Sequence, residues 1–126
     1  MTELFTLARL GAPGREVPVV RSGGRLLDAR SVASDFDAAF FAEGGIGRVR
    51  DALADLPDYG GEGQRVGAPI ARPGKIVCIG LNYRDHAEET GAALPTEPVV
   101  FMKDPSTLVG PFDDVLIPRG SKKTDW

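Results

Sequence analysis

Two short apolar runs constrain the second part of the chain most strongly: KIVCIG at 75–80 and PVVFMK at 98–103. Each has the length of a strand and is nearly free of polar residues, which is the pattern of a strand buried on both faces. Pro98 stands at the first position of its run, where a missing N–H costs least. DVLIP at 114–118 has the same character. We therefore expect three buried strands and a mainly β second part.

The first part of the chain has a different hydrophobic pattern. Residues 3–28 alternate roughly by twos and are interrupted by GAPG and SGG, which predicts three short strands joined by turns. Ser34 and Asp35 are good helix caps before FDAAFFA, and the pair Gly44 and Gly45 ends that segment. A second helix is then predicted from apolar residues at helical spacing. These are Ile46, Val49, Leu53 and Leu56.

Glycine and proline dominate the stretch from Pro57 to Pro69, which has no regular pattern and is read as a linker. This division predicts an α+β fold with a small N-terminal α+β domain at 1–70. A second domain then begins and occupies 71–126.

Composition excludes several classes of protein. The 126 residues are 42% hydrophobic and 26% charged, which is typical of a globular chain. A net charge of -3 without a basic cluster argues against a nucleic-acid partner. No segment has the roughly 20 apolar residues of a membrane span, and the N-terminus lacks the pattern of a signal peptide. The lone Cys78 is expected to be structural and agrees with a reducing, cytoplasmic location.

The segment RDHAEET after the first apolar run contains the only histidine of the chain. His86 and Glu89 stand at i and i+3, so a helix would place both side chains on one face. A carboxylate beside an imidazole fixes its tautomer and raises its basicity, as a general base for water requires. The alternative is an incidental pair on a solvated helix. The position directly after a buried strand favours a site, because strand ends are where sites are commonly built.

Further candidates follow the second apolar run. Lys103 ends that run and would neutralise an anionic substrate or a developing enolate, although a lysine that snorkels at a strand end has the same pattern. Ser106 and Thr107 are candidate donors to a carboxylate, with ordinary turn chemistry as the alternative. Arg84 is a further candidate for substrate binding. No dinucleotide, P-loop or HExxH motif occurs.

The run RPGKIVCIGLNYRDHAEETG, followed by PTEPVVFMKDPSTLVGP and DVLIPRGSKKTDW, closely resembles the start of the catalytic domain of the fumarylacetoacetate hydrolase family. The resemblance covers residues 72–126, and the part before it resembles, more weakly, the small N-terminal domain of bacterial members. It implies a mixed β-roll catalytic domain whose beginning is present at 71–126. It also implies a divalent cation, usually Mg²⁺ or Mn²⁺, that chelates a 2-oxo acid or 1,3-diketone.

The same resemblance implies roles for individual residues. His86 and Glu89 match the family's water-activating pair, and Lys103 matches its lysine near the substrate. We expect a hydrolase or lyase that cleaves a carbon–carbon bond in substrates of the fumarylpyruvate or acylpyruvate kind, working as a homodimer. An isomerase or an oxaloacetate-type decarboxylase on the same scaffold is the alternative, and a non-catalytic assembly fragment is another.

The family's metal ligands form an ExE pattern that follows a D[WY] pair, and here Asp125 and Trp126 end the sequence. We therefore expect the metal ligands beyond Trp126, a truncated catalytic domain, and no activity from the 126 residues alone.

Overall fold

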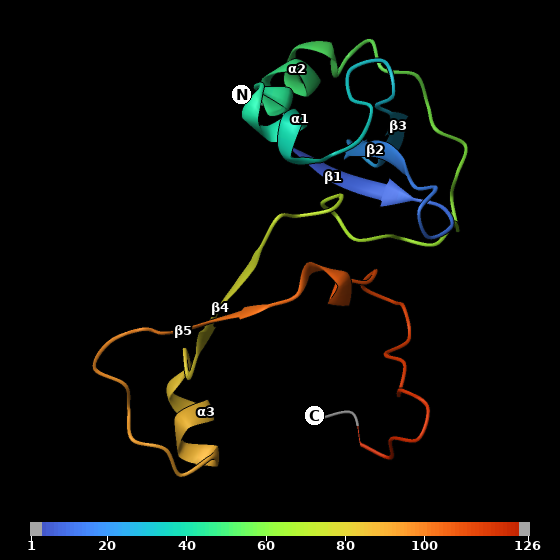
Figure 1. Ribbon diagram of the computed structural model, residues 1–126. Coiled ribbons are helices and arrows are strands. Elements are labelled where there is room, and N and C mark those ends of the chain that lie inside the picture. The colour runs from blue at the N-terminus through green and yellow to red at the C-terminus, as the bar shows by residue number, and fades with distance from the viewer. Residues whose placement is uncertain (1–3, 124–126) are drawn as a thin grey trace. The chain divides into compact units, whose positions relative to one another are not determined.

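The computed structural model describes residues 4–123 (Figure 1). The chain forms two compact units: the first holds the described residues up to Ala71 and those from Val109 onward, and the second runs from Arg72 to Leu108. Strands and short helices occur in both, so the α+β class expected from the sequence is confirmed. The expected domain division between residues 70 and 71 stays a prediction.

Three antiparallel strands in the order β1-β2-β3 form the sheet of the first unit. They are β1 (Phe5–Leu10), β2 (Val17–Ser22) and β3 (Arg25–Asp28), as the alternating pattern predicted. Gly23 and Gly24 connect β2 to β3 with φ values of 54° and 81°. Two successive positive φ angles are what a tight two-residue hairpin turn requires, and glycine adopts them without steric cost.

Two short helices follow, α1 (Ala38–Ala42) and α2 (Gly45–Ala52). The expected caps at Ser34 and Asp35 were wrong by two residues or more, because the N-cap is Asp37, whose carboxylate accepts a hydrogen bond of 3.1 Å from the Phe40 N–H. Gly44 has a left-handed backbone between the helices, but Gly45 is the first residue of α2 and does not interrupt a helix.

The hydrophobic core of this unit lies between the sheet and the two helices (Figure 1). The rings of Phe36 and Phe40 pack at a tilt with centroids 4.9 Å apart, and both residues are buried, as are Val20 and Val49. Leu27, Ala29, Ala33, Leu53 and Leu56 complete the buried cluster. Val49 of α2 is a core residue, and Ile46 packs against the cluster. Leu53 and Leu56 are core residues too, but the prediction that they belong to the helix was wrong, because α2 ends at Ala52.

The stretch from Pro57 to Pro69 is not the linker that its composition predicted. Asp58 forms a β-bridge with Leu27 of β3, and Val66 forms another with Leu10 of β1. The Gly11 N–H donates to the Arg65 carbonyl oxygen (2.9 Å), and backbone hydrogen bonds also join residues 57 and 59 to β3. The stretch therefore contacts both outer strands of the sheet. Backbone pairing of this kind leaves no signal in side-chain periodicity.

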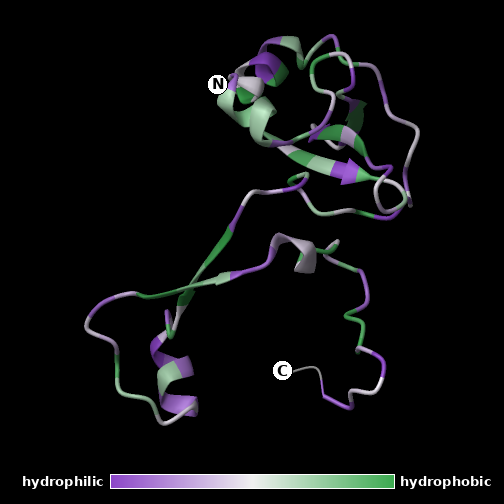
Figure 2. Ribbon diagram, viewed as in Figure 1, coloured by the Kyte–Doolittle hydropathy of each residue, from purple (hydrophilic) through white to green (hydrophobic). Residues whose placement is uncertain are grey.

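The second unit is a hairpin with one helix. Strand β4 (Ile76–Gly80) leads to α3 (Arg84–Glu89), and the chain returns as β5 (Val99–Lys103), antiparallel to β4, and a 3₁₀ turn, η1 (Pro105–Thr107). Both strands stand where the apolar runs predicted them, and Figure 2 shows their hydrophobic character. The expected burial on both faces was wrong, because all five residues of β5 are exposed.

The third expected strand, DVLIP at 114–118, was also wrong, since these residues have no strand partner and no regular structure. Leu116 is 84% exposed and Phe112 is 85% exposed. An apolar run predicts a strand only where a neighbouring strand supplies its hydrogen bonds. Within the described residues, no helix is long and apolar enough to cross a membrane.

Candidate functional site

Helix α3 follows closely after strand β4 and carries two of the predicted site residues. His86 and Glu89 are both exposed and stand one turn apart on α3. Ala87 is fully buried, and the Thr90 hydroxyl at the C-cap donates back to the His86 carbonyl oxygen of the same helix at 2.9 Å. The His86 N–H donates to the Asp85 carboxylate at 2.8 Å. The imidazole and the Glu89 carboxylate therefore face solvent on a helix with a single buried anchor.

Between β4 and α3 the backbone is strained. Leu81 is half-buried and has a φ of 48°, in the left-handed region that costs a non-glycine residue roughly 1–3 kcal/mol. The strain turns the chain out of the strand just before Tyr83, which is extended and caps α3. Strained residues of this kind gather at ligand-binding sites. Sequence reasoning missed Leu81, because leucine in a GLNY stretch carries no sign of a left-handed backbone.

Lys103 ends β5, and the turn after it is fixed by Asp104. The Asp104 carboxylate accepts the Ser106 N–H at 2.8 Å, and the Thr107 hydroxyl donates to the Asp104 carbonyl oxygen at 2.7 Å. The hydroxyl and the backbone N–H of Ser106 together lower the pKa of the Asp104 carboxyl. Ser106 and Thr107 are exposed, but their donors are engaged in this turn. Both residues therefore stabilise the turn, and their contact with a substrate carboxylate stays a prediction.

The hairpin register separates the predicted site residues. Gly80, at the α3 end of β4, pairs with Val99, whereas Lys103 pairs with Ile76. Four residue steps lie between these pairs, or roughly 14 Å at about 3.4 Å per residue. Figure 1 shows α3 beyond the end of the hairpin opposite to the one where β5 leads into η1. The structure thus places His86 and Glu89 one turn apart on α3, with the exposed Arg84 at the start of the same helix, and it does not bring Lys103 to them.

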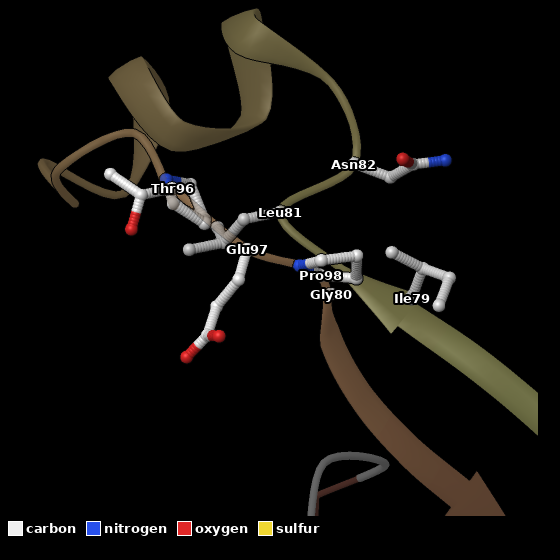
Figure 3. Close-up of a pocket in the computed structure, with 8 residues that line it drawn as sticks. Ile79, Gly80, Leu81, Asn82, Thr96, Glu97 and Pro98 are labelled. Carbon is white, nitrogen blue, oxygen red and sulfur yellow. The ribbon is translucent and has the colours of Figure 1, made fainter.

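A hollow of about 330 Å³ opens where β4 ends and β5 begins. Its lining residues are Ile79, Gly80, Leu81, Asn82, Pro95, Thr96, Glu97 and Pro98 (Figure 3). The Asn82 amide and the Glu97 carboxylate point in different directions, so the polar groups do not converge on one point. Sequence reasoning named none of these residues as site residues. The one signal in the sequence that could have indicated this hollow was the position of Asn82 within GLNYRDH.

Metal binding depends on the donor atoms that the fold brings together. Among residues 4–123, no three or more His, Cys, Asp or Glu side chains gather in a way that could hold a metal ion. Hard cations such as Mg²⁺ need several oxygen ligands. The described residues therefore do not fit a resident metal. Cys78 is a free, half-buried thiol opposite Phe101 in the hairpin.

Comparison with known proteins identifies the second part of the chain. Residues 75–126 match the family described as fumarylacetoacetate (FAA) hydrolase, C-terminal. Over these residues the chain is similar to the fumarylacetoacetate hydrolase family. Its fold resembles that of a fumarylacetoacetate hydrolase from the psychrophilic Exiguobacterium antarcticum, with a TM-score of 0.63 and 28% identity over 89% of this chain and 40% of that chain.

Similarity to curated proteins also extends over the N-terminal unit of the chain. Two proteins named "Putative hydrolase", from Burkholderia multivorans and Burkholderia cenocepacia, are 46% and 43% identical to it over 123 and 122 residues. Each alignment covers 95% of this chain and 43% of the relative. The chain therefore spans less than half the length of these relatives.

Proposed function

We propose that the chain contributes part of the active site of a divalent-metal-dependent hydrolase that cleaves a carbon–carbon bond in a 2-oxo acid or 1,3-diketo acid of the acylpyruvate or fumarylpyruvate type. The observation that carries the proposal is the family match over residues 75–126, which includes the pair His86 and Glu89 on α3. Both side chains are exposed and free to meet a substrate.

Each residue has a role that follows from its chemistry. The His86 imidazole takes a proton from the attacking water, and Glu89 orients that imidazole from the same helical face. Lys103 at the end of β5 pairs with the substrate carboxylate, as an exposed ammonium group does with an anion. Arg84, at the first position of α3, supplies a second cation. Ser106 and Thr107 are weaker candidates, because their hydrogen bonds already stabilise the turn.

Helix α3 must change position for this chemistry, because Lys103 and the Gly80 end of β4 are separated by the length of the hairpin. A small 2-oxo acid is shorter than that separation. We therefore include in the proposal that α3 closes over the bound substrate. Its single buried anchor, Ala87, and the strained Leu81 before it are consistent with a segment that moves.

Mg²⁺ or Mn²⁺ is proposed as the cofactor on the family resemblance alone, and no step is assigned to it because residues 4–123 do not gather its ligands. When bound, such an ion polarises a carbonyl oxygen and stabilises an enolate. A cytoplasmic location and a homodimer are likewise proposals. Neither nucleic acid nor a membrane is proposed as a partner.

The test is a set of paired assays on the full-length protein. Hydrolysis of an acylpyruvate and decarboxylation of oxaloacetate are measured on one preparation, with saturating Mg²⁺ and again after chelation. Hydrolysis that depends on the metal supports the proposal. Decarboxylation without hydrolysis would favour the decarboxylase alternative, and the absence of both, together with no turnover of an enol–keto isomerisation substrate, would favour a non-catalytic module.

A further inference from the structure

A pair of charged residues in the first unit holds the chain where it returns from the second unit. Arg65 donates two hydrogen bonds to the Asp113 carboxylate, one of them from Nε at 2.7 Å to Oδ1. The guanidinium also donates from Nη1 to the Gly11 carbonyl oxygen (3.1 Å) and to the Glu16 carboxylate (3.0 Å). Two-pronged pairing of this kind fixes both the distance and the orientation of its partners.

Asp113 in turn restrains Gly110 through two hydrogen bonds. Its Oδ2 accepts the Gly110 N–H at 2.7 Å, and its own N–H donates to the Gly110 carbonyl oxygen at 3.1 Å. Gly110 is buried, and a Cβ at this position would overlap the Val66 carbonyl oxygen. The backbone at Gly110 therefore lies directly on the backbone at Val66, which forms a β-bridge with Leu10 of β1.

The segment immediately before Gly110 is short and internally hydrogen-bonded. The Leu108 N–H donates to the Pro105 carbonyl oxygen (3.1 Å), and the Thr107 N–H donates to the Asp104 carbonyl oxygen (3.0 Å). These bonds make residues 104–108 a turn with little freedom of its own. Lys103 is joined to this turn at one end, and Gly110 follows it closely at the other.

We propose that Arg65 and Asp113 are positioning residues that act on Lys103 through the chain, because they fix the far end of the turn that follows β5. Neither residue is assigned a contact with substrate. Lys103 is exposed, as are the other residues of β5. Its backbone is joined directly to the turn at 104–108, so we expect a looser turn to make Lys103 more mobile. This functional part of the inference rests on the proposed function.

Amide hydrogen exchange on the full-length protein tests the restraint without reference to activity. Asp113→Ala removes the charge and the acceptor for Gly110, whereas Asp113→Asn keeps an acceptor oxygen and loses the charge. We expect the amides at 106–110 to exchange about tenfold faster in Asp113→Ala, with a smaller change in Asp113→Asn and no change in β1, β2 or β3.

Asp58→Ala is the matched control, because Asp58 also pairs with an arginine, Arg25, but with 71% of its side chain exposed. It should leave exchange at 106–110 unchanged. Equal exchange at 106–110 in Asp113→Ala and Asp58→Ala would overturn the proposal. Faster exchange spread evenly over β1, β2 and β3 would overturn it as well, since that pattern means general destabilisation.

Kinetics on an acylpyruvate then test the consequence at Lys103. Asp113→Ala should lower kcat/KM by roughly tenfold to a hundredfold, mostly through a higher KM, because the cation that binds the carboxylate becomes more mobile. Asp113→Asn should recover part of this loss. If the wild-type protein hydrolyses no 2-oxo acid, the proposed function fails and the exchange experiment still decides the restraint. If it does and Asp113→Ala keeps the wild-type KM, the positioning role fails alone.

Discussion

His86 and Lys103 are carried at opposite ends of the β4–β5 hairpin: α3, with His86, follows the Gly80 end of β4, whereas Lys103 pairs with Ile76. A reaction that uses both side chains on one small substrate therefore requires α3 to move. The strained Leu81 and the single buried anchor of α3 identify the segment that has to change.

The first prediction is that α3 exchanges its amide hydrogens faster than β4 and β5 when no ligand is bound. Ala87 is the one buried residue of α3, and few apolar anchors mean a low free energy of local opening. Addition of a 2-oxo acid analogue such as oxalate, with Mg²⁺, should slow exchange at 84–90. Protection of α3 equal to that of the hairpin before ligand is added would count against closure.

The second prediction concerns the base. His86→Ala should lower kcat for hydrolysis by roughly 10² to 10⁴, the usual contribution of a positioned base, while Glu89→Ala should lower it less. Glu88→Ala is the control, because Glu88 is exposed on the same helix and stands beside Glu89. Wild-type hydrolysis by His86→Ala would exclude the imidazole as the base. Loss of hydrolysis with retained decarboxylation would support the decarboxylase alternative.

The sequence predicted those features that depend on local pattern. Alternation located β1, β2 and β3, the apolar runs located β4 and β5, and the polar segment located α3. The features that the sequence did not predict depend on backbone pairing between distant residues. The stretch at 57–69 pairs with β1 and β3 through main-chain groups, which leave no mark on side-chain identity.

The burial predicted for the two apolar runs was wrong for a related reason. The apolar patterns of KIVCIG and PVVFMK show that a strand needs apolar packing on both faces. They do not show whether neighbouring elements provide that packing. In the candidate site, motif and spacing predicted His86, Glu89 and Lys103, and no local signal gives the register that sets Lys103 opposite Ile76.

The third prediction tests the charge network in the first unit. Arg9 is 8% exposed, and it donates two hydrogen bonds to Asp35, at 2.7 and 3.0 Å, and one to the Ala68 carbonyl oxygen at 3.1 Å. Arg9→Met should lower the free energy of unfolding by roughly 3–5 kcal/mol, because it removes the partner of a largely buried carboxylate. Arg25→Met, at an exposed ion pair, should cost about 1 kcal/mol or less. Urea unfolding measures both.

The fourth prediction is a loss of stability in acid. Hydrogen bonds from Arg65, followed by the one from the Gly110 N–H, lower the pKa of Asp113 from an ordinary value of 3.8. Burial alone would raise the pKa of Glu16, but its backbone hydrogen bond and the charges of Arg65 and Arg9 outweigh burial and lower it from 4.5. A lowered folded pKa stabilises the fold above the unfolded pKa, and this stabilisation disappears as pH falls through the folded value.

The free energy of unfolding should therefore be constant near neutral pH and fall below about pH 4.5, where both carboxylates begin to titrate in the unfolded chain. Asp113→Asn removes one of the carboxyl groups with a lowered pKa, so its unfolding free energy should depend less steeply on pH in this range. A slope in Asp113→Asn that equals the wild-type slope would show that the ion pair with Arg65 does not contribute.

The fifth prediction concerns the close backbone contact at Gly110. A Cβ at this position would overlap the Val66 carbonyl oxygen and lie 2.9 Å from the Asp113 carboxylate. Backbone cannot move aside as a flexible side chain does, so Gly110→Ala should destabilise the protein by about 1–3 kcal/mol or more. Gly47→Ala in α2 is the matched control, because nothing lies within 4 Å of the position that its methyl group would occupy. There the loss of backbone freedom in the unfolded chain should stabilise the protein by about 0.4–1 kcal/mol. Urea unfolding should thus give changes of opposite sign for the same substitution, and equal effects at the two positions would show that residues 110 and 66 are not in contact.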